Sequence, residues 1–395
     1  MNRTLLFISL FSILTLVSCH SSKKNEAGKQ NEIELVAEKQ LAFPLDEQTY
    51  YLSKSMFQFE ENGKEYLHFE NTRKSLYDIV IFDIENKQIA KRIPLHKTGP
   101  NGLPAVYGSR PSPDSKQILI SQNNIGRLST INNQGEVVHN YPVKTPEGRF
   151  TTFFFCSYYN APAFVKDSCI FLNQGIFKPN MKREDWPQTH MFASQNLKTG
   201  KFEWVPIFYP PIFKEEYENI DGGYGFSYDY NYKENRLVCG FFGYDSLMVT
   251  DDLKHIRWYN AKSKYLKSMK PKLGNAMAGI NSIIEFCEAP MYWHIMYDKY
   301  RDVYYRFAEM PYKLAPNESP YDEPKGKEFS VIVLNADFEI IGDTKFPGKK
   351  YFYKMSFVGK EGLYISENNL ANPQFDENKL VFTCFKIKGH LKTQK

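Results

Sequence analysis

Histidine and cysteine are scarce in this chain, and neither is arranged as a metal or redox site. The 395 residues include eight histidines and six cysteines, without an HExxH, CxxC or paired-histidine motif. Asp-box repeats, a glycine-rich phosphate loop and a GxSxG elbow are missing too, since Gly225-Phe226-Ser227-Tyr228 departs from the elbow pattern at Asp229. We therefore predict no metal, no cofactor and no catalytic residue.

Charge of one sign does not gather anywhere along the chain. Lysine and arginine number 50 against 45 aspartate and glutamate residues, so the formal net charge is +5, and the lysines are dispersed. A nucleic-acid-binding protein usually carries a basic stripe. Nucleic acid is therefore not an expected partner.

The only pronounced apolar run lies at the N-terminus, and it is too short to predict a membrane-spanning helix. Residues 1–18 have a basic residue, an apolar core and small residues before Cys19, as in a secretory signal peptide. The segment Leu16-Val17-Ser18-Cys19 resembles the bacterial lipobox, which implies that Cys19 is diacylated and becomes the first mature residue. An ordinary signal peptide cut near the same place is the alternative.

Residues 19–31 are predicted to be a lipidated cysteine and a flexible tether, because the segment is polar and lacks apolar periodicity. Two or three acyl chains hold a protein on a bilayer far more firmly than one. Lys23 and Lys24 stand where some surface-exposed lipoproteins carry acidic residues. We therefore expect an exported protein anchored in the outer membrane, with the periplasmic side favoured over the cell surface.

What the chain does contain is a repeated strand pattern. In Tyr77–Leu95 a buried strand, Ile79–Phe82, is followed by a polar turn and an edge strand ending at Pro94. Proline suits an edge strand because it cannot donate to a ladder. The pattern recurs in four further segments, each with another hairpin upstream: Arg127–Val143, Met191–Ile207, Leu247–Asn260 and Phe329–Gly348.

Units of this size with four strands each are typical of propeller blades. Residues 32–390 are therefore predicted to be one all-β domain, a β-propeller. Edge-strand endings near six residues give six blades: Pro44, Pro94, Pro142, Pro206, Trp258 and Pro347. Seven blades is the alternative, because residues 261–289 could hide strands. The N-terminal strand Ile33–Leu45 lacks a partner of its own and is predicted to close the ring on Leu380–Ile387, which removes exposed edges.

Three short motifs strengthen this assignment: Gly99-Pro100-Asn101-Gly102, Ser112-Pro113-Asp114 and Asp302-Val303-Tyr304-Tyr305-Arg306. With them, the mature chain resembles a family of Bacteroidota-type lipoproteins that have a six-bladed, TolB-like β-propeller and no established activity. The resemblance implies a fold and a location in the cell envelope. It implies no catalytic residue.

Long loops are predicted to gather at one face of the ring. Connections between blades and between the second and third strands of a blade leave the same face. In this sequence those are the long ones: His96–Pro104, Lys178–Thr189, Tyr209–Gly225, Ala261–Pro290, Tyr312–Glu328 and Leu370–Lys379. Long loops on a rigid scaffold usually carry binding groups. We predict that this long-loop face binds a ligand.

Five candidate binding residues lie on these loops: Asn101, Trp186, Asp221, Tyr224 and Tyr321. Aromatic rings among amides and charges suit a glycan or an extended peptide, because the rings stack and the polar groups orient. The alternative is that the aromatic rings pack their own loops onto the disc.

Four further candidates lie on strands. Arg110, Asp229 and His294 are placed by the pattern on innermost strands, at the mouth of the central channel. For His294 the alternative is a structural, hydrogen-bonded histidine. Arg306 is expected either to hold an anionic group or to pair with a nearby carboxylate.

Residues 261–289 depart from the repeat. Lys264–Met269 and Ala276–Phe286 contain apolar residues three or four apart, which indicates a short helix on the disc. It would be a lid or docking element, or a packing insertion. Cys156 and Cys169 could form a disulfide across the first hairpin of the third blade, but we favour free thiols.

Two functions follow from these observations. The first is a monomeric, membrane-tethered, non-catalytic propeller that binds a protein, peptide or glycan. The second is a propeller hydrolase or lyase that acts on polysaccharide.

Overall fold

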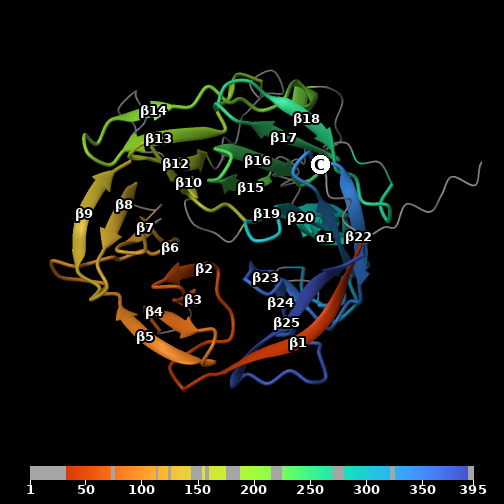
Figure 1. The fold of residues 1–395 in the computed structure, drawn as a ribbon, viewed down its shortest axis with the longest axis horizontal. Coiled ribbons are helices and arrows are strands. Elements are labelled where there is room, and N and C mark those ends of the chain that lie inside the picture. The colour runs from red at the N-terminus through yellow and green to blue at the C-terminus, as the bar shows by residue number, and fades with distance from the viewer. Residues whose placement is uncertain are drawn as a thin grey trace, which may run out of the picture.

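The strands of the chain form six sheets arranged in a ring (Figure 1). The computed structural model describes residues 33–389 except 73–75, 113, 123–125, 144–153, 156–159, 175–186, 215–224, 268, 270–279 and 321–324. Each sheet is one blade of antiparallel strands, so the prediction of a six-bladed β-propeller is confirmed.

The first half of the ring holds three blades, with strands running outward from the axis in chain order. Blade 1 consists of β2 (Met56–Glu61), β3 (Lys64–Asn71), β4 (Asp78–Asp83) and β5 (Gln88–Pro94). Blade 2 consists of β6 (Gly108–Pro111), β7 (Ile118–Gln122), β8 (Arg127–Ile131) and β9 (Val137–Pro142). Blade 3 consists of β10 (Phe154–Phe155), β11 (Phe164–Lys166), β12 (Cys169–Gln174), β13 (Phe192–Asn196) and β14 (Phe202–Trp204).

The second half completes the ring with the remaining strands. Blade 4 consists of β15 (Phe226–Asn231), β16 (Arg236–Phe241), β17 (Ser246–Thr250) and β18 (Arg257–Asn260). Blade 5 consists of β19 (Met291–Asp298), β20 (Val303–Glu309), β21 (Phe329–Leu334) and β22 (Ile340–Phe346). Blade 6 consists of β23 (Phe352–Val358), β24 (Leu363–Ser366), β25 (Lys379–Lys388) and β1 (Glu34–Pro44).

Blade 3 departs from the four-stranded plan at its inner edge. Two short strands, β10 and β11, both pair with β12 in place of one continuous inner strand. Cys169 lies opposite Lys166 in this sheet and is a free thiol. Cys156, its predicted disulfide partner, lies outside the described residues.

The N-terminal strand closes the ring, as predicted. β1 pairs antiparallel with β25 from Glu34 opposite Lys388 to Pro44 opposite Lys379, over ten residue pairs with one irregularity near Lys39. In Figure 1 the red β1 lies along the outside of the blue β25. Blade 6 is therefore built from both ends of the chain.

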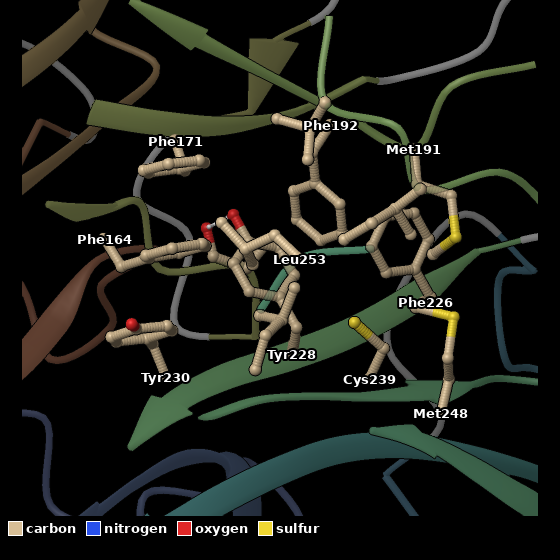
Figure 2. Packing of buried hydrophobic residues seen from close by; sticks show 14 of the residues in the cluster. Phe164, Phe171, Met191, Phe192, Phe226, Tyr228, Tyr230, Cys239, Met248 and Leu253 are labelled. Atoms are coloured by element: carbon tan, nitrogen blue, oxygen red, sulfur yellow. Dashed lines mark hydrogen bonds between the residues drawn. The ribbon is translucent and has the colours of Figure 1, made fainter. Parts of the chain in front are cut away.

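Apolar side chains fill the spaces between neighbouring blades. Between blades 3 and 4, Phe164 stacks on Phe171 and on Tyr230, with ring centroids 4.6 and 4.3 Å apart (Figure 2). Phe192 and Tyr228 meet edge to face beside them, at 5.0 Å. Because strand side chains alternate in direction, each blade offers one apolar face to each neighbour. Aromatic residues, which are numerous in the sequence, thus pack one blade against the next.

The insertion after blade 4 contributes one helix, α1 (Ile280–Glu288), and no strand among its described residues. The predicted helix is therefore present, whereas Lys264–Leu266 forms a turn. α1 ends against the loop between β20 and β21, where Lys327 Nζ donates to the carbonyls of Cys287 and Ala289. In the described part of the chain, no helix is long and apolar enough to cross a bilayer.

Candidate functional site

The candidate site lies around the axis of the ring, where side chains from different blades meet. Most residues of the innermost strands are buried, but Phe57, Arg110, Asp229 and Trp293 remain partly exposed. They belong to blades 1, 2, 4 and 5, and Lys354 of blade 6 contacts Trp293. We call these five residues the axial site.

Arg110 is held by two neighbouring blades. Its guanidinium lies 5.1 Å from the centre of the Phe57 ring in blade 1. Its Nη1 donates to the carbonyl of Ala163 in blade 3. A cation over an aromatic face is attracted by the ring quadrupole. The side chain is therefore oriented, although no carboxylate in the described ranges forms an ion pair with it.

Asp229 is fixed by backbone amides. Tyr230 N donates to Oδ1 and Tyr297 N donates to Oδ2, both at 2.8 Å. Burial raises the pKa of Asp229 to about 6, although these amides and the nearby charge of Arg110 favour the ionised form. The acid therefore ties blade 4 to blade 5 and is protonated more readily than an ordinary aspartate.

This raised pKa makes a pH-dependent contribution to stability. The folded chain keeps the Asp229 proton up to about pH 6, whereas the unfolded chain releases it near the ordinary value of 3.8. Between these two values the native state binds more protons, so the free energy of unfolding falls as pH rises. We expect the difference between wild type and Asp229→Asn to change by on the order of 2–3 kcal/mol from pH 4 to pH 7.

Urea unfolding at several pH values measures this effect. Asp337→Asn, in an exposed turn between β21 and β22, is the matched control, and its curve should run parallel to wild type. If Asp229→Asn also runs parallel to wild type, the proton on Asp229 is not linked to folding.

Trp293 and Lys354 form the second half of the axial site. The Lys354 ammonium lies 3.8 Å from the centre of the Trp293 ring, and Phe242 stacks on the same indole at 4.8 Å. Lys354 is 8% exposed. Beside it, the buried Glu309 forms an ion pair with Lys327 at 2.5 Å. The Trp293 indole is thus packed between protein side chains and helps to position the Lys354 ammonium.

A polar cluster between blades 1 and 2 lies next to Arg110. His68 Nε2 lies 2.9 Å from Ser109 Oγ, and burial lowers the pKa of His68 to about 3. Burial also raises the pKa of Glu70, which Ser109 and Ser55 contact. We did not predict this cluster from the sequence. The alternation of His68 and Glu70 with apolar neighbours in β3 is the signal that could have located it.

The other strand candidates are buried. His294 is 2% exposed and stacks on Phe307 at 5.7 Å. Arg306 is 1% exposed and donates to backbone carbonyls, including Tyr244 at 2.6 Å and Ala261 at 2.9 Å. Arg306 therefore donates its hydrogen bonds to carbonyls, while the charge of the nearby Asp245 carboxylate also acts on it. The reason is that β20 is the second strand of its blade and is covered on both faces.

The loop candidates separate into two groups. Asn101 accepts a hydrogen bond from Val137 N at 3.0 Å, so it joins the loop after blade 1 to β9. The other four lie outside the described residues: Trp186, Asp221, Tyr224 and Tyr321. Cys19 lies outside them too. Of the nine candidates, the structure brings together Arg110 and Asp229.

The axial site is suited to binding a charged group. It combines a guanidinium, an ammonium and a carboxyl with a raised pKa within one ring of strands. Within the described ranges, no cluster of three or more His, Cys, Asp or Glu side chains is arranged to hold a metal ion.

Comparison with known proteins identifies relatives of the whole domain. Residues 32–345 match the family described as Domain of unknown function (DUF4221). A DUF4221 family member from Bacteroides vulgatus is 85% identical, with a TM-score of 0.88, covering 92% of this chain and 100% of that chain. A protein from Bacteroides fragilis, proposed to be exported, has a TM-score of 0.55 at 9% identity, covering 92% and 97%. None of the curated proteins matches the chain.

Proposed function

This chain belongs to the DUF4221 family, and on that premise we propose that it is a membrane-tethered, non-catalytic binding protein of the cell envelope. Its ligand is a protein, peptide or glycan, held at the long-loop face of the propeller. The main supporting observation is that charged and aromatic side chains of five blades lie on the innermost strands around the axis, in one group at Arg110 and another at Trp293. Binding sites commonly combine apolar walls with a few placed polar groups.

The path of the chain agrees with a tethered protein. β1 starts at Glu34 opposite Lys388, at the end of the ring that carries the hairpin turns, and runs toward Pro44 at the long-loop face. A tether of residues 19–31 would therefore join the ring at the hairpin face. A flexible segment of this length spans on average about 20 Å. The long-loop face is thus free to meet a ligand while Cys19 stays in the bilayer.

The positions of Trp293 and Lys354 along their strands support the long-loop face as the ligand-binding face. Trp293 and Lys354 each lie two residues after the start of an innermost strand, β19 and β23, and both strands start at that face. Residues near this end of the axis can be reached from the loops. The relative that is proposed to be exported supports a location outside the cytoplasm.

Lipid attachment is the first test of the proposal. We expect the full-length protein, expressed in a Bacteroides host, to incorporate labelled fatty acid and to sediment with membranes. Cys19→Ser should lose the label and move to the soluble fraction, because the acyl chains provide the anchorage. Cys169→Ser is the control and should keep the label. A labelled Cys19→Ser protein would contradict the anchor.

Ligand capture is the second test. Lipid-free protein is incubated with envelope extract and with a glycan panel, and retained molecules are analysed for products. Retention of an unchanged molecule supports a binding function. Release of a cleaved polysaccharide would favour the hydrolase or lyase activity instead.

A further inference from the structure

We propose that the axial site recognises a carboxylate on its ligand and that Arg110 is the residue that binds this carboxylate. This inference rests on the proposed binding function and specifies the chemistry of its ligand.

Arg110 has donors to spare. Its Nη1 donates a hydrogen bond to the carbonyl of Ala163, while Nε and Nη2 have no acceptor in the described part of the chain. These two groups form one edge of the guanidinium. A planar carboxylate matches such an edge with two parallel hydrogen bonds, which a spherical anion cannot do. Because Phe57 and Ala163 already orient the side chain, little rotamer freedom would be lost on binding.

The charge of Arg110 favours the ionised form of Asp229, but no ion pair joins these two side chains within the described ranges. Asp229 uses both carboxyl oxygens to accept the amides of Tyr230 and Tyr297. Because Asp229 is held by these backbone amides, the charged edge of Arg110 is left for an anionic ligand.

The hairpin end of the axis is bridged by side chains of three blades. Glu60 of blade 1 binds Lys299 at 2.8 Å and Tyr300 at 2.7 Å, both from blade 5, and Lys360 of blade 6 at 3.1 Å. Gln58 Nε2 also donates to Tyr300 Oη at 3.0 Å. These ion pairs hold the pKa of Glu60 at about 2. A ligand would therefore reach Arg110 from the long-loop face.

Isothermal titration of the mature protein with sodium glucuronate, succinate and benzoate tests the proposal, with glucose as the neutral match for glucuronate. We expect at least one carboxylate to bind and glucose not to bind. Arg110→Gln should weaken that binding by at least tenfold. Arg110→Lys should weaken it by a smaller factor, because an ammonium keeps the charge but lacks the two-donor edge.

Arg257→Gln, on the outer strand β18, is the matched control and should bind like wild type. Circular dichroism and thermal unfolding establish that each variant is folded; if Arg110→Gln does not fold, Arg110→Lys carries the comparison. The proposal is overturned if none of the three carboxylates binds, or if the Arg110 variants bind as tightly as wild type. Either result leaves the proposed function standing when envelope extract still yields a retained ligand.

Discussion

Deleting residues 33–45 is expected to abolish the cooperative unfolding of the domain. The deletion removes β1, whose Leu35, Leu41 and Phe43 are at most 5% exposed, and it leaves β25 as an unpaired edge. Burial of one large apolar side chain contributes about 1.5–3 kcal/mol, so the loss approaches the whole stability of a typical domain, about 5–15 kcal/mol. Urea unfolding followed by fluorescence should show no transition, and exposed strand edges should cause aggregation.

A circular permutant provides the matched control for this deletion. Lys388 at the end of β25 lies opposite Glu34 at the start of β1. A two-residue turn can join antiparallel strands at such a position. A chain that begins at residue 46 and carries residues 33–45 after Gly389 should therefore unfold cooperatively, like the parent domain. If the simple deletion unfolds like the parent, ring closure by β1 does not stabilise the fold.

Replacing Arg306 by methionine is expected to be the most damaging single substitution. The Arg306 guanidinium lies 3.6 Å from the centre of the Tyr292 ring. It also donates hydrogen bonds to the backbone carbonyls of four residues: Phe241, Tyr244, Asp245 and Ala261. Burial lowers the pKa of Arg306 to about 10, so it stays charged at neutral pH. Each hydrogen bond to a charged group contributes about 1.5–3 kcal/mol. We expect Arg306→Met to lower the free energy of unfolding by more than about 4 kcal/mol.

Two further variants separate the hydrogen bonds of Arg306 from its charge. Arg306→Lys keeps the charge but cannot reach all of the carbonyls, so about half of the loss is expected. Arg257→Met removes an exposed arginine that pairs with Asp251 on the outside of blade 4, the blade whose carbonyls Arg306 of blade 5 contacts. Surface ion pairs contribute about 0–1 kcal/mol. Guanidinium unfolding measures all three variants, and an Arg306→Met loss within 1 kcal/mol of the Arg257→Met loss would refute the structural role.

Much of the fold could be predicted because strand periodicity is a local property. Ile79–Phe82 and Pro94 are enough to place a buried strand and an edge strand, and they correspond to β4 and β5. The N-terminal strand around Pro44 has no neighbouring partner in the sequence, so it was predicted to pair at the other end of the chain, and β25 is that partner. Blade 3 was harder to predict, because its inner edge is split between β10 and β11.

The site could be predicted only in part. The pattern placed Arg110 and Asp229 on innermost strands, and the structure brings them close enough for their charges to interact. His294 and Arg306 lie on strands as well, but neighbouring blades cover them. The pairing of Lys354 with Trp293 joins blades 5 and 6, and no local pattern relates residues so far apart.

The amino-acid sequence alone predicted the blade pattern, the closing role of the first strand and a count of six blades, with seven as the alternative that the structure removes. These depend on alternation, turns and edge prolines, which are written in neighbouring residues. Only the tertiary structure decided which polar side chains stay inside a blade and which reach the axis, because that depends on how one blade packs against the next. Arg306 and Arg110 illustrate the difference: both are strand arginines, yet the first is enclosed by carbonyls and the second keeps one edge free among the described residues.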